Sequence, residues 1–75
     1  MKKITLVRFV EHIQLGKGLD PKSYVEDGGF VQGVPVKLSK HDDSFLRIDF
    51  NGKDKVNKYS QLVPWNTVAT VMFED

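Results

Sequence analysis

The chain contains no cysteine and only two histidines, His12 and His41. Disulfide bonds and thiolate zinc sites are therefore excluded. The two imidazoles are far apart along the chain and do not have the spacing of paired metal ligands. We expect neither a metal ion nor any other cofactor.

An excess of charge of one sign is also missing, since the net charge is +1. Such a balance gives no strong general attraction to nucleic acid. No apolar run approaches the ~20 residues that span a bilayer. Lys2 and Lys3 begin the chain like an export signal, but Arg8, Glu11 and His12 interrupt the apolar stretch that a signal needs. We expect a soluble, cytoplasmic protein without membrane contact.

The sequence has no catalytic signature. Residues 41–44 read His-Asp-Asp-Ser, but a catalytic triad needs side chains that converge from separate parts of a scaffold. Asp43 and Ser44 are ordinary turn formers, because their oxygens accept hydrogen bonds from nearby backbone N–H groups. The glycines of residues 16–18 and 27–29 are too few for a phosphate loop, and no helix pattern follows them. We expect neither enzymatic activity nor a small-molecule substrate.

Short apolar stretches separated by turn signals predict an all-β chain, with residues 1–75 as a single small domain. The predicted strands cover residues 4–15, 23–26, 30–38, 45–50, 59–63 and 67–73. Strands so short and so closely spaced favour a small, strongly bent five- to six-stranded barrel. Closing the barrel would remove the exposed sheet edges.

Residues 4–15 leave two interpretations open. Leu6, Phe9, Val10 and Ile13 have the spacing of one face of a helix. The many β-branched residues of the same stretch favour a strand. We expect a strand, with an N-terminal helix as the alternative.

The turns carry further expectations. Asp-Gly-Gly at residues 27–29 is a strong turn signal, because glycine reaches positive φ without steric cost. Gly33 and Pro35 interrupt the following apolar stretch, and both residues weaken a regular strand ladder. The sequence therefore predicts one bent strand over residues 30–38.

Asn51-Gly52 predicts a hairpin, and the apolar pattern decides its register. A two-residue loop would set the apolar face of residues 45–50 against polar residues of the return strand. A three-residue loop over residues 51–53 pairs Ile48 with Val56 instead. Because a one-residue shift moves every side chain to the opposite face, we expect the three-residue loop or a bulge.

The segment LVPWNTVATV resembles the closing part of SH3-like and Sm-like barrels, where a single 3₁₀ turn joins the last two strands. Over residues 28–71 the chain resembles the Sm-like proteins, a family that includes the bacterial RNA chaperone. The similar features are Gly29-Phe30, Gly33, Asp42-Asp43, Gly52-Lys53 and Val68-Ala69-Thr70-Val71. The resemblance implies a bent barrel and, for Sm-like proteins, a ring that binds single-stranded RNA. Trp65-Asn66 stands where the chaperone has a Lys-His pair, so the family's RNA-binding residues are not matched.

Trp65, the only tryptophan, directly follows a proline at the break between two predicted strands. Its side chain could close one end of the barrel, with the indole N–H hydrogen-bonded at the rim. The alternative is an exposed anchor for a protein, or a stacking surface for an unpaired base. Lysines interleaved with aromatic residues precede it in the sequence. The candidate partner-binding residues are Lys53, Lys55, Lys58, Tyr59, Trp65 and Asn66.

Taken together, these features indicate a non-enzymatic binding module. We expect a small accessory or regulatory protein, of the kind that phages encode, which binds another protein or assembles with copies of itself. The alternative is an Sm-like oligomer that binds single-stranded RNA. A structural subunit whose edge strands pair across a larger assembly is a further hypothesis.

Overall fold

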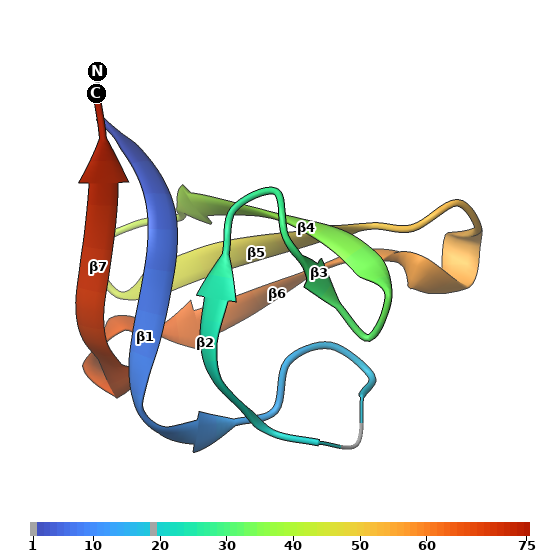
Figure 1. Cartoon of the computed structure of the whole chain (residues 1–75), viewed down its shortest axis with the longest axis horizontal. Coiled ribbons are helices and arrows are strands. Elements are labelled where there is room, and N and C mark those ends of the chain that lie inside the picture. Colours follow the sequence, from blue (N-terminus) through green and yellow to red (C-terminus); the bar gives the residue numbers. More distant parts are fainter. Residues whose placement is uncertain (1, 19) are drawn as a thin grey trace.

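The computed structural model describes residues 2–18 and 20–75, which form seven strands and two single-turn 3₁₀ helices. These elements are β1 (Lys3–Ile13), β2 (Lys22–Glu26), β3 (Phe30–Val31), β4 (Val34–Lys40), β5 (Phe45–Asn51), η1 (Lys55–Asn57), β6 (Lys58–Pro64), η2 (Trp65–Thr67) and β7 (Val68–Glu74). They form two antiparallel sheets, with the strand orders β2-β1-β7 and β3-β4-β5-β6. Figure 1 shows the strands of one sheet crossing those of the other at a large angle. No helix in this part of the chain is long and apolar enough to cross a membrane.

The all-β prediction is confirmed, and so is the strand over most of residues 4–15. The alternative of an N-terminal helix is wrong, because this stretch is β1, the central strand of its sheet. Hydrogen bonding to a strand on each side stabilises the extended backbone. The inward-facing side chains Ile4, Val7 and Phe9 are buried in the core.

The prediction of a closed barrel is wrong. Among the described strands, β6 pairs only with β5 and β7 pairs only with β1, so each sheet keeps two free edges. The strand β6 ends at Pro64, which has no backbone N–H for a further ladder bond. The turn η2 then carries the chain from one sheet to the other.

The stretch of residues 30–38 is a tight hairpin of β3 and β4, and the prediction of one bent strand is wrong. Gln32 and Gly33 form the two-residue turn, with φ values of 53° and 77°. Positive φ at both central positions is typical of a type I′ turn, which matches the twist of the flanking strands. Val31 and Val34 lie opposite each other directly beside it.

The connection between β5 and β6 is longer than three residues and their ladder has a continuous register, so the predicted three-residue loop or bulge is wrong. Residues 52–57 connect the strands and include η1. The Asp54 carboxylate accepts a hydrogen bond of 3.0 Å from the backbone N–H of Asn57 and so caps this turn. Apolar residues still meet across the ladder, since Phe50 lies opposite Tyr59.

The inner faces of the two sheets enclose one apolar core. Its members are Ile4, Val7, Phe9, Leu15, Val25, Val31, Val36, Leu38, Leu46, Ile48, Phe50 and Val63. Burial of each of the larger side chains stabilises the fold by about 1.5–3 kcal/mol. No polar or charged residue is fully buried in the described part of the chain. The hydrophobic contact between the sheets therefore holds them together without a buried polar network.

Asp27 adds a polar connection between the sheets at one end of this core. Its side chain is only 8% exposed, and one carboxylate oxygen lies 3.1 Å from Lys3 Nζ. The other oxygen accepts a hydrogen bond of 2.8 Å from the backbone N–H of Leu38. Burial raises the pKa of Asp27, but the hydrogen bond from Leu38 and the contacts with Lys3 outweigh it. The pKa therefore lies below the ordinary value of 3.8.

We predict that Asp27→Asn lowers the free energy of unfolding by about 1 kcal/mol at neutral pH. The amide can still accept from Leu38 N–H, but it loses the attraction to the Lys3 ammonium. A carboxyl group with a depressed folded-state pKa stabilises the fold above its unfolded pKa, and this contribution is lost as the pH falls through the folded pKa.

Urea denaturation of both proteins should therefore show a difference in stability that is constant near neutral pH. The difference should shrink as the pH falls below the ordinary Asp pKa of 3.8. A difference that stays the same throughout the acidic range would contradict this role of the Asp27 charge.

Candidate functional site

A groove of about 670 Å³ opens where β1 begins and where β4 and β7 approach their ends. Its lining residues are Lys2, Lys3, Ile4, Leu38, Ser39, Lys40, Trp65, Val71 and Phe73. Ile4 and Leu38 are buried and belong to the core, so the bottom of the groove is continuous with the interior. Figure 1 shows the start of β1 and the end of β7 side by side at this end of the domain. The groove is thus a place where the two sheets do not close over their shared core.

The strand β7 supplies one wall of the groove. Phe73 lies opposite Ile4, and Val71 lies opposite Val7. Cross-strand partners share a face of the sheet, so Val71 and Phe73 both point towards the second sheet. Because no described strand covers this edge, the Phe73 side chain remains 56% exposed.

Trp65 in η2 stands at another side of the groove and is held by two hydrogen bonds. Its indole Nε1–H donates to the carbonyl of Asp42 over 2.8 Å, and its backbone N–H donates to the carbonyl of Ser44 over 3.0 Å. The side chain is half-buried and packs against the core. The indole thus covers the end of the core and also lines the groove.

The turn of residues 41–44 provides these acceptors. The Asp42 carboxylate accepts hydrogen bonds of 2.8 Å from the backbone N–H groups of Ser44 and Phe45. These two bonds hold the pKa of Asp42 below its ordinary value. The turn was predicted, but the acceptor role expected of Asp43 and Ser44 belongs to Asp42. The His-Asp-Asp-Ser segment therefore fixes the backbone that holds the indole.

Three lysines give the groove a basic rim, namely Lys2, Lys3 and Lys40. The side chains of Lys3 and Lys40 are 66% and 60% exposed although each lies near a carboxylate. The partner of Lys40 is Asp43, at 2.9 Å on the open surface. Exposed ion pairs of this kind contribute little to stability. The lining residues that the structure describes include no Asp or Glu.

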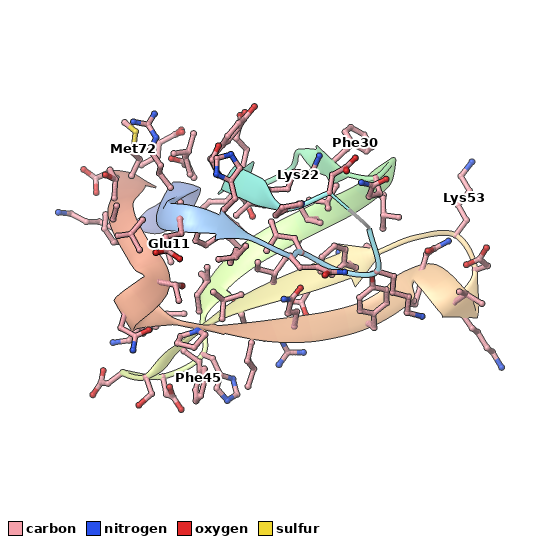
Figure 2. The ribbon with its side chains drawn as sticks, turned by 90° about the horizontal axis from the view of Figure 1, so that it is seen from below. Glu11, Lys22, Phe30, Phe45, Lys53 and Met72 are labelled. Carbon is pink, nitrogen blue, oxygen red and sulfur yellow. The ribbon has the colours of Figure 1, made fainter. Side chains whose placement is uncertain are left out.

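The structure divides the six predicted binding residues between the two ends of β6. Trp65 and Asn66 lie in η2, after the end of this strand, whereas Lys58 and Tyr59 begin it. A strand of seven residues spans roughly 20 Å. Lys53 and Lys55 lie farther out, and Figure 2 shows Lys53 at the tip of the hairpin, far from Phe45. Trp65 and the hairpin lysines therefore do not lie next to one another.

Tyr59 is engaged within the domain. Its ring stacks on Phe50 with 4.7 Å between the centroids. Its hydroxyl accepts a hydrogen bond of 3.0 Å from the backbone N–H of Lys17, and the ammonium of Lys17 lies 4.8 Å from the ring centroid. Gly16 is held nearby, because its N–H donates to the Gln61 side chain over 2.7 Å. These contacts attach the loop that follows β1 to β6.

Sequence reasoning missed most of the groove. Lys2, Lys3 and Lys40 were not candidate binding residues, and Phe73 was an ordinary residue of the last strand. Alternation in the final strand could have placed Val71 and Phe73 on one face. No sequence signal could bring residues from opposite ends of the chain together without the strand pairing.

We predict that Trp65→Phe lowers the free energy of unfolding by about 1 kcal/mol. Phenylalanine keeps most of the apolar contact but loses the hydrogen bond from the indole to Asp42. Amide hydrogen exchange in residues 42–45 should become faster, whereas exchange in the distant β5–β6 connection should not change. Unchanged exchange in the turn would mean that the indole does not hold it.

Comparison with known proteins provides no relative on which to base the function. No family model, no curated protein and no solved structure matches this chain. The function must therefore be inferred from the groove itself.

Proposed function

We propose that this chain is a non-enzymatic module that binds another protein in the groove between its two sheets. Phe73 carries this proposal, because it is a large apolar side chain on an edge strand, exposed beside a half-buried tryptophan. Exposed apolar surface that is continuous with a groove often marks a protein-binding site. Aromatic residues at the centre of such a surface typically contribute much of the binding energy.

The order of the strands supports an SH3-like or Sm-like scaffold as part of this proposal. Strands β4, β5 and β6 follow one another as a meander. The single turn η2 then leads to β7, which pairs with the first strand. This connection is the feature expected from the LVPWNTVATV segment. The scaffold still leaves the partner open, because one fold can carry many unrelated functions.

Binding of single-stranded RNA by an Sm-like ring is the alternative. The rim supports it, since Lys2, Lys3 and Lys40 surround the groove that Trp65 lines. An indole can stack on an unpaired base while ammonium groups contact phosphates. The distance between Trp65 and the hairpin lysines weakens the version of this hypothesis that relied on Lys53, Lys55 and Lys58.

We predict that Phe73→Ser abolishes or strongly weakens capture of the partner from extracts of the cells that make the protein. Met72→Ser is the matched control. Met72 is 53% exposed and Phe73 is 56% exposed, and successive residues of a strand point to opposite faces. With the captured protein purified, Phe73→Ser should weaken binding by at least about tenfold, whereas Met72→Ser should change it little.

Equal binding by wild type and Phe73→Ser would remove the groove as the docking site. Loss of binding in both variants, with both folded by circular dichroism, would point to the outer face or the edge of β7. Each outcome is read against the unfolding midpoint of the same variant, so that loss of the fold is not mistaken for loss of the site.

Light scattering coupled to gel filtration, followed by titration with oligouridylate, tests the alternative. An Sm-like RNA binder should form a closed ring, and its affinity for RNA should fall steeply as salt is added. A monomer that does not bind oligouridylate would leave docking of a separate protein as the function. A defined oligomer without RNA binding would favour self-assembly through the free edges of the sheets.

A further inference from the structure

We propose that the occupant of the groove is an acidic, extended peptide segment whose apolar side chains enter between the sheets. This inference rests on the proposed function and specifies its partner. Three features support it together: the basic rim, the aliphatic interior and the free edge of β7.

The charged side chains that line the groove are all basic. Three ammonium groups lie on its rim, and the lining described by the structure contributes no carboxylate. Three acidic residues lie next to these lysines but outside the lining. Asp27 contacts Lys3, Asp43 contacts Lys40, and Glu74 lies opposite Lys3 in the β1–β7 ladder. Asp27 is mostly buried and also accepts from a backbone N–H, yet the Lys3 side chain is 66% exposed. The ammonium groups therefore remain accessible to carboxylates of a ligand, which electrostatic complementarity would select.

The interior of the groove favours bulky apolar side chains. Ile4, Leu38 and Val71 are aliphatic, and Trp65 and Phe73 add two aromatic surfaces. A volume of about 670 Å³ lies in the range of ordinary ligand sites and exceeds that of one side chain. Several apolar residues of one segment could therefore enter it, with acidic residues placed between them at the lysine rim.

The free edge of β7 favours an extended backbone. On the side away from β1, this strand has no partner among the described strands. An added peptide strand can form main-chain hydrogen bonds with such an edge, and its alternate side chains then point to one face. Alternation of acidic and apolar residues would match the arrangement of rim and interior.

A nucleic acid would meet the same charges but a less suitable interior. Bases are recognised by stacking and by hydrogen bonds to their edges. Apart from the three lysines and the indole of Trp65, Ser39 is the only described lining residue with a polar side chain. Aliphatic side chains cover the rest of the interior, so the groove suits a peptide better than a base.

Trp65 supplies the probe for a direct test, because it is the only tryptophan and lines the groove. The ligand is a pool of synthetic seven-residue peptides in which glutamate alternates with Leu, Ile, Val, Phe or Met. A second pool replaces every glutamate with glutamine. We expect the acidic pool to shift and saturate Trp65 fluorescence and to bind at least about tenfold more tightly than the glutamine pool.

Variants of the rim locate the effect. Lys2→Gln and Lys40→Gln should each weaken binding of the acidic pool by about two- to fivefold, and added salt should reduce the difference from wild type. Lys22→Gln, in β2 and outside the lining of the groove, is the matched control and should leave binding unchanged. Binding of the glutamine pool should be the same in all four proteins.

Equal binding of the two pools would overturn the inference while leaving the groove as a docking site. Absence of binding by the acidic pool would also overturn it, and saturable binding of oligouridylate in its place would favour the RNA alternative. Failure of the proposed function has a separate signature, because capture of the natural partner would then be insensitive to Phe73→Ser.

Discussion

The arrangement of the two sheets depends on the turn from β6 through η2 into β7. Pro64 ends one strand, and the backbone and indole N–H groups of Trp65 are both held by carbonyls of the 41–44 turn. This attachment directs the chain from β6 into β7, which pairs with β1. As a result of this change of sheet, β6 and β7 do not pair with each other. The groove is thus a direct result of how the chain changes sheets.

The opposite ends of β6 have different structural roles. At its start, Tyr59 and Gln61 hold the loop that follows β1 through hydrogen bonds and an aromatic stack. The chain's own loop therefore packs against that end of β6. At its finish, Trp65 packs against the core on one side and lines open space on the other. At the second end, an apolar groove therefore lies next to Lys2 and Lys3.

Asp27 connects the two sheets at the groove. Its carboxylate joins Lys3 of β1 to the backbone of Leu38 in β4, and both residues line the groove. In a domain of this size the hydrophobic core alone gives limited stability. A polar contact between the sheets therefore both stabilises the domain and keeps two walls of the groove in place.

Local patterns were sufficient for several elements of the fold. Three elements were predicted from residues that act on the nearby backbone. They are the strand β1 with its β-branched residues, the turn at 27–29 with its glycines, and the break at the proline before η2. Longer loops were harder, because the capping of η1 by Asp54 competes with the simple Asn-Gly hairpin. The turn at Gln32-Gly33 was missed because an ordinary residue there adopts positive φ.

The sequence by itself determined that the chain is all-β and where most of its strands lie, because alternation and turn residues act over short distances. Only the tertiary structure decided which strand edges remain open and which side chains share a site. One groove is lined by residues as distant in the sequence as Lys2, Lys40, Trp65 and Phe73, because β1 and β7 pair and the two sheets cross. Such contacts depend on long-range packing, for which a single sequence contains no local signal.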